Sequence, residues 1–302
     1  MDLLETRFPA RTVLPDTPVQ RLVARLLELY GDEWLLLPAM HYRWSFWHQR
    51  AHIDDVLEHF GMLLSPRAPR WLRRRAGRQF CKPFDGALPM LGITARTIPA
   101  LEASYGAMLD ELDRHFLRHR YLLGDRASIG DFGFIGPLYA HLGRDPYPKA
   151  LMQRRAPNVW AWVQRMNEVA PAIGDWLPDD AIPDTLLPVL RRLFAEQGPV
   201  LIDTVAEVER WLDAHPDAQR LPRVVGRHRY RLGDVEEERS VFPYPQWMLQ
   251  RVLDDYRALG GAARVRADTV FAPLGGSALM QLDIRRRVTR RQHRLVPEAA
   301  AS

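Results

Sequence analysis

The chain has 302 residues, of which 47% are hydrophobic and 26% are charged, as in an ordinary globular protein. That length can bury a large core and allows two domains. No apolar run is long enough to cross a membrane, and the N-terminus lacks the basic-then-apolar layout of a secretory signal. The only cysteine, Cys81, has no intramolecular disulfide partner, so we expect a reducing, cytoplasmic location.

The formal net charge of +5 raises the question of nucleic-acid binding. Only Lys82 and Lys149 are lysines, and such a bias toward arginine more often reflects genome composition than phosphate binding. Outside two clusters, at residues 67–78 and 285–294, the positive charge is spread along the chain. We therefore rank nucleic-acid binding last among the functions considered below.

Residues 1–16 are predicted to form a helix fragment and an extended linker that contains two prolines. From residue 17, where a threonine and a proline suit a helix start, apolar side chains recur at helical spacing toward Trp44. Gly31 and Pro38 fall within this run, and they predict a bend or a break in the helix.

Histidines and acids follow at spacings of four, three and four residues, which place them on one helical face. They are His48, His52, Asp55 and His59. Two histidines one turn apart can share a metal ion, but this spacing matches no recognised zinc motif, and solvated polar faces are common. We therefore predict a solvated face and no metal site.

Six arginines lie between residues 67 and 78, interleaved with Trp71 and Leu72. They could bind an anion or a nucleic-acid backbone. The favoured alternative is an amphipathic surface helix whose guanidinium groups pair with the acidic side chains just upstream. Lys82 could lower the thiol pKa of the adjacent Cys81, but a buried structural cysteine is the favoured interpretation.

A long helix is predicted from residue 97 to about 120, and a tight turn at Gly124 precedes a second helix at 129–141. Ser128 and Asp131 have the spacing of a structural capping box, in which each residue bonds the backbone N–H of the other. In this box the third helical position holds aspartate, whose side chain is one carbon shorter than that of the usual glutamate or glutamine. Because the second helix is apolar on nearly all sides, we expect it at the centre of the fold.

Another helix begins at Pro157, which completes a bundle of about five or six helices without a strand pattern. Residues 171–188 form a proline-rich linker, and one or two helices follow to residue 213. Residues 223–231 and 236–242 are predicted to form a β-hairpin in which arginines face glutamates. A helix at about 246–259 and a basic tail complete the chain.

Three stretches resemble the glutathione S-transferase family. The run Leu122-x-Gly124-Asp125-x-x-Ser128-x-x-Asp131-Phe132 is similar to the capped core helix of its all-helical C-terminal domain. Residues 3–9 and 13–15 are similar to the last helix of its thioredoxin-like domain and the linker after it, and residues 156–166 to the helix after the core helix. The resemblance covers about residues 1–170.

The resemblance implies a mainly α fold, with a glutathione S-transferase C-terminal-like helical bundle and a long, kinked first helix. A smaller α+β C-terminal region with a β-hairpin at about 223–242 follows it. We accordingly divide the chain into a remnant helix and linker at 1–16, the helical domain at 17–170, and the α+β region at 171–302.

In that family the thioredoxin-like domain holds glutathione and activates its thiolate. The resemblance implies that this domain is missing here, so no catalytic residue is carried over, and glutathione is a co-substrate only if the domain is supplied. We therefore expect a glutathione S-transferase-like protein that is inactive alone and has no cofactor. Two alternatives stay open: a non-catalytic module that binds a ligand or a protein, and a basic nucleic-acid-binding protein. A homodimer is expected by resemblance only.

The helical domain of the family also lines a hydrophobic substrate pocket. Its candidate wall residues for a small hydrophobic ligand are Trp34, His41, Tyr42, Trp44, Tyr105 and Met108. The alternative, which we weigh as the more frequent case, is that these side chains are simply core.

Overall fold

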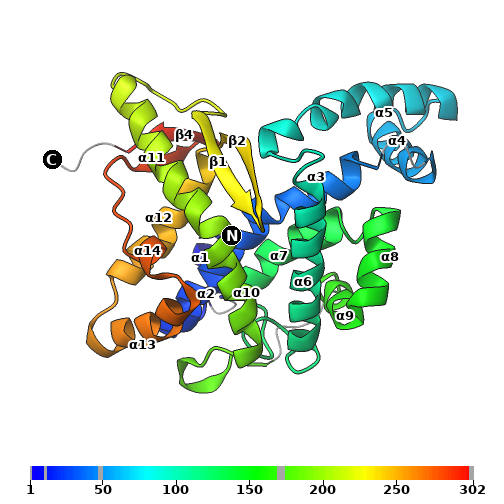
Figure 1. Cartoon of the computed structure of the whole chain (residues 1–302). Helices are drawn as coiled ribbons and strands as arrows, with labels where there is room; N and C mark the ends of the chain where they lie inside the picture. Colours follow the sequence, from blue (N-terminus) through cyan, green and yellow to red (C-terminus); the bar gives the residue numbers. More distant parts are fainter. Residues whose placement is uncertain (1, 10–11, 47–49, 169–173, 299–302) are drawn as a thin grey trace.

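The computed structural model describes residues 2–9, 12–46, 50–168 and 174–298, and helices dominate it (Figure 1). The α-helices are α1 (Asp2–Arg7), α2 (Pro18–Leu29), α3 (Leu36–Trp44), α4 (Arg50–Leu64), α5 (Arg70–Asp85), α6 (Ile98–Phe116), α7 (Ile129–Ala140), α8 (Pro146–Arg155), α9 (Pro157–Met166), α10 (Leu187–Arg192), α11 (Gly198–Ala214), α12 (Tyr244–Arg257), α13 (Gly261–Phe271) and α14 (Ser277–Met280). The strands are β1 (Gly226–Leu232), β2 (Val235–Val241), β3 (Val288–Arg291) and β4 (Arg294–Pro297). The mainly α fold with a C-terminal hairpin is therefore as predicted.

The first long helix is interrupted at Gly31, one of the two positions that its sequence predicted, whereas Pro38, the other, lies in the first turn of α3. At Gly31, α2 passes through a five-residue π-helical turn, η2 (Tyr30–Trp34), before α3 begins. The π-helical turn lies where the first helix packs on α7, and a Cβ on Gly31 would stand only 2.5 Å from the backbone carbon of Gly133. A Cβ on Gly133 would in turn stand 2.7 Å from Cα of Glu28. Only glycine at both positions allows the two backbones to approach this closely.

Helix α7 is central on one side only. Phe134 and Leu138 are fully buried against neighbouring helices, whereas Phe132 and Tyr139 are exposed. The expected burial on nearly all sides is therefore wrong for one face, because α2, α3 and α9 pack on the opposite side of the helix.

Asp131 joins three parts of the bundle from the first turn of α7, where it forms the capping box with Ser128. Its carboxylate accepts hydrogen bonds from the backbone N–H of Ser128 at 2.8 Å, the N–H of Leu122 at 3.0 Å and Nε1–H of Trp162 at 3.1 Å. The Ser128 hydroxyl donates a further bond at 2.9 Å. Complete burial raises the pKa of Asp131 to about 6, and these hydrogen bonds oppose the shift.

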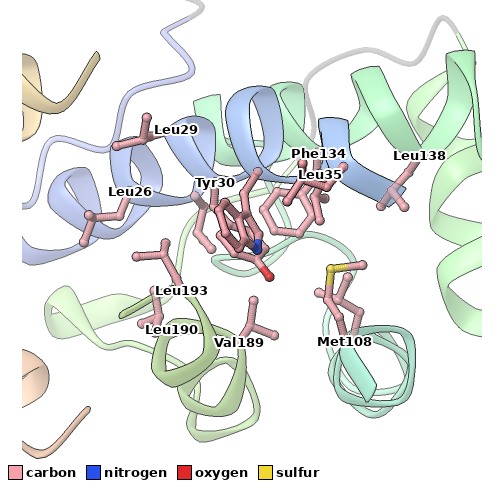
Figure 2. Packing of buried hydrophobic residues seen from close by; sticks show 14 of the residues in the cluster. Leu26, Leu29, Tyr30, Leu35, Met108, Phe134, Leu138, Val189, Leu190 and Leu193 are labelled. Carbon is pink, nitrogen blue, oxygen red and sulfur yellow. The ribbon is translucent and has the colours of Figure 1, made fainter. Parts of the chain in front are cut away.

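One hydrophobic core includes residues from both sides of residue 170. Figure 2 shows Tyr30 and Phe134 side by side, with Val189, Leu190 and Leu193 beneath them, and all five belong to the same buried cluster. Helices α12 and α13 pack on α2, so that α2 separates them from α6, α8 and α9 (Figure 1). The division of the chain into three parts remains a prediction. In the described residues, the core continues across the predicted boundary at residue 170.

The predicted hairpin is formed by β1 and β2, which a two-residue turn connects. Gly233 adopts a positive φ of 57° in that turn, as such tight hairpin turns require. The antiparallel register sets Arg229 opposite Glu238 and Arg231 opposite Glu236, and Arg231 forms an ion pair with Glu236. The sequence therefore predicted both the pairing and the charge pattern.

The basic tail contains a second hairpin, β3–β4, that was not predicted. Its turn residues, Gln292 and His293, have positive φ angles of 46° and 63° without being glycine, so the sequence carried no turn signal. Three of the six arginines at residues 285–294 form ion pairs with described residues: Arg285 with Glu209, Arg286 with Asp213, and Arg287 with Asp254 and Glu298.

Three of the five arginines of α5 pair with acids of α4, in line with the prediction: Arg73 and Arg70 with Glu58, and Arg74 with Asp54. Of the histidines and acids on the predicted polar face, His48 lies outside the described residues. The described part of the chain holds no group of side chains that could ligate a metal.

Cys81 is buried, and burial raises its thiol pKa to about 11. No helix in the described ranges has the length and apolar character needed to span a bilayer.

We expect Asp131→Ala to lower the free energy of unfolding by about 3 kcal/mol or more, because it leaves three buried N–H donors without an acceptor. The measurement is urea unfolding followed by circular dichroism. The exposed Asp217→Ala serves as the control and should change stability little. Equal effects of the two substitutions would contradict this role of Asp131.

His115 gives the fold a pH dependence. It is fully buried, its Nε2–H donates to the carbonyl of Tyr121 at 3.2 Å, and its Nδ1 accepts from the Thr185 hydroxyl at 2.9 Å. Burial lowers its pKa to about 4, so the folded protein keeps the ring neutral where the unfolded chain, with a pKa near 6.5, takes up a proton. The stability that His115 supports is therefore complete above pH 6.5 and is lost as the pH falls toward 4.

We expect the unfolding free energy of the wild type to fall by about 2 to 3 kcal/mol more than that of His115→Gln between pH 7 and pH 4. The buried Asp131 acts in the opposite direction, and the comparison of the two proteins cancels its contribution. Urea unfolding across this pH range measures the difference. The exposed His215→Gln should follow the wild type, and parallel curves for His115→Gln would refute the assignment.

Candidate functional site

A cavity of about 1340 Å³ lies between the first helix, at η2 and α3, and the β1–β2 hairpin. Residues of η2, α3 and α5 line one side, and residues of α11, β1, β2, the loop at residues 220–223 and the start of β4 line the other. Its volume exceeds the several hundred Å³ of an ordinary small-molecule site.

One wall of the cavity is a stack of aromatic rings. The rings of Trp44 and Phe84 lie nearly parallel with centroids 5.7 Å apart, Phe60 lies 6.2 Å from Trp44, and Phe80 lies 5.1 Å from Phe60. Phe80 and Phe84 are one helical turn apart on α5, so they share a face. They nevertheless remain 40% and 39% exposed, which leaves apolar surface in contact with solvent at the cavity.

Two glycines bring α4 and α5 close enough to assemble this wall. A Cβ on Gly61 would stand 2.4 Å from the carbonyl oxygen of Arg73, and one on Gly77 would stand 2.5 Å from that of Leu57. The backbones of the two helices therefore pass at a distance that no larger residue permits.

The opposite end of the cavity is polar, and the hairpin supplies its principal groups. His228 of β1 and Arg239 of β2 are cross-strand partners in the register, and both point inward, with 8% and 7% of their surface exposed. The Arg239 guanidinium carbon lies 5.6 Å from the ring centroid of Trp34 and 5.5 Å from that of Tyr230. These cation–π contacts hold the charged group beside the cavity.

Two π-helical turns meet beside this polar end. Turn η2 contributes Glu33 and Trp34 to the lining, and turn η6 (Leu193–Gln197) contributes Gln197. The Trp34 Nε1–H donates to Glu196 of η6 at 3.2 Å, which ties the turns together. A π-helical turn inside an α-helix changes the direction of the side chains that follow, and such turns occur often at functional sites.

Burial keeps the ionisable neighbours of Arg239 neutral near pH 7. Burial, with a smaller contribution from the charge of Arg239, lowers the pKa of His228 to about 4. Burial and the neighbouring Asp32, opposed by Arg239, raise the pKa of Glu33 to about 8. Arg239 is therefore the charge that dominates this end of the cavity.

The six pocket candidates from the sequence separate in the structure. Trp34 and Trp44 line the cavity. Trp34, Tyr105 and Met108 also border a second hollow of about 10 Å³, which has room for one water molecule at most. His41 and Tyr42 are buried: His41 bonds Ser45 and Glu102, both at 2.9 Å, and the Tyr42 ring packs against that of Tyr105.

Sequence reasoning missed the groups at the polar end. The alternation of His228, Tyr230 and Leu232 with arginines in β1 is a period-two signal that could have marked His228 as inward-facing. Arg239 follows three consecutive glutamates and gives no such signal, because its burial follows from the docking of the hairpin on η2 and α11.

Comparison with known proteins places part of this fold in a family. Residues 95–165 match the family model described as the glutathione S-transferase C-terminal domain. This segment runs from just before α6 to the end of α9, and it is a glutathione S-transferase C-terminal-like domain. Neither the curated proteins nor the solved structures gave a match. Among the described residues that line the cavity, His141 alone falls within the matched segment.

Proposed function

We propose that this chain, which contains a glutathione S-transferase C-terminal-like domain, binds a small hydrophobic ligand in the cavity beside the β1–β2 hairpin. The observation that carries the proposal is the aromatic wall of Trp44, Phe60, Phe80 and Phe84 facing a cavity of about 1340 Å³. An apolar ligand against this wall removes exposed ring surface from water, at about 25 cal/mol per Å².

The arginine clusters support nucleic-acid binding less well than their sequences suggested. In the cluster at residues 67–78, Arg70, Arg73 and Arg74 are engaged by acids of α4, and in the tail Arg285 and Arg286 are engaged by acids of α11. A phosphate backbone would have to compete with these ion pairs. The homodimer and the cytoplasmic location stay predictions.

The neutral fluorescent probe N-phenyl-1-naphthylamine tests the cavity. We expect saturable binding to the wild type and a dissociation constant about 5- to 10-fold larger for Phe84→Ser, since the variant loses about 1 kcal/mol of apolar contact. Phe132→Ser is the matched control, because Phe132 is equally exposed, at 39%, and lies outside the cavity lining. No saturable binding, or equal weakening by both substitutions, would overturn the proposal.

We also propose that these 302 residues do not conjugate glutathione by themselves. In the family they resemble, a thioredoxin-like domain holds the peptide, and the sheets of the described residues are two separate two-stranded hairpins. We expect the reaction of glutathione with 1-chloro-2,4-dinitrobenzene to run at the uncatalysed rate when the chain is added. A rate proportional to protein concentration, which an unrelated purified protein does not give, would contradict this.

A further inference from the structure

Arg239 carries a buried charge that no carboxylate neutralises. Among the ion pairs of the described residues, none involves Arg239, and its Nε and Nη1 have no hydrogen-bond partner. A guanidinium remains charged in a protein interior. Leaving such a group unpaired costs folding stability, so an arrangement of this kind is often explained by a ligand that completes it.

The lining of the cavity is unbalanced in charge. Glu33 is its one acidic residue among the described residues, and burial keeps that side chain protonated near neutral pH. The lining also contains four arginines besides Arg43: Arg239, Arg220 and Arg223, and Arg294 at the start of β4. Arg43 also lines the cavity, but its charge is matched by Asp145 at 2.8 Å. The cavity therefore presents a positive field to whatever enters it.

Asp203, the carboxylate facing His228, does not remove this imbalance. Its Oδ2 lies 3.7 Å from Nδ1 of His228, the pair is ionic only if the ring is protonated, and the His228 pKa is lowered to about 4. Nδ1 of His228 also has no hydrogen-bond partner in the described part of the chain. His228 and Arg239 thus present two incompletely bonded polar groups on adjacent strands.

We infer that the cavity takes an apolar carboxylate, with the carboxylate paired to Arg239 and the apolar body against the aromatic wall formed by Trp44, Phe60, Phe80 and Phe84. This inference rests on the proposed ligand-binding function and names its ligand class. A compact, planar oxyanion suits a guanidinium, and desolvation at Arg239 strengthens the charge-assisted hydrogen bond. The neutral His228 stands beside the same position, on the facing strand.

Displacement of N-phenyl-1-naphthylamine by decanoate and by 1-decanol tests the inference, since the two competitors share an apolar chain and differ in charge. For the wild type we expect decanoate to bind more tightly than 1-decanol. Arg239→Met should weaken decanoate binding about 10- to 100-fold, the range expected for losing a charge-assisted hydrogen bond, and leave 1-decanol within about 2-fold.

Arg229→Met is the matched control, because Arg229 lies on the same hairpin, is exposed and is absent from the cavity lining. It removes the same charge and should leave both competitors unchanged. Arg239→Lys keeps the charge but not the planar donors, and decanoate should stay within about 10-fold of the wild type. This second variant keeps the test decisive if Arg239→Met does not fold.

The outcomes separate the inference from the proposed function. If the probe binds but decanoate is no better than 1-decanol, or Arg239→Met weakens both equally, the carboxylate assignment is overturned and ligand binding stands. If decanoate binding is lost equally in Arg229→Met, the effect is one of overall charge, and the assignment again fails. If the probe itself does not bind, the proposed function fails first.

Discussion

The close crossing of α2 and α7 is the constraint on which the rest of the structure depends. Gly31 and Gly133 let the two backbones meet without a Cβ between them. At the same place the first helix widens into a π-helical turn, which delivers Glu33 and Trp34 to the cavity. Asp131 lies two residues before Gly133, in the first turn of α7, and its carboxylate bonds Trp162 of α9. The crossing therefore joins the matched helical domain to the cavity that lies mostly outside it.

The cavity combines an apolar surface, which is stabilised by the removal of water, with a charged one, which is destabilised by it. The aromatic side offers rings that gain free energy by leaving solvent, whereas the hairpin side holds a guanidinium that loses solvation by burial. The rings of Trp34 and Tyr230 partly offset that loss. A ligand with both an apolar body and a negative group satisfies both sides, which is why the cavity and the charge are best explained together.

Much of the bundle was predictable because its signals are local. The spacing of Ser128 and Asp131 indicated the start of α7, and Gly31 marked the interruption of the first helix. The two-residue turn at Gly233 set the β1–β2 register. The candidate site was predicted less well: Trp34 and Trp44 reach the cavity, while His41 and Tyr42 point into the core. Helical spacing identifies the apolar face of a helix, but it does not say which residues of that face another element covers.

The sequence by itself determined the helical class, the glutathione S-transferase C-terminal-like segment and the hairpin, since capping, turn chemistry and periodicity act within a few residues. Tertiary structure alone decided that Arg239, His228 and Glu33 share one end of a cavity. Those side chains come from segments distant in the chain, and their inward orientation arises when the hairpin docks on η2 and α11. Burial then sets the charge of each group, and burial is a property of the assembled fold.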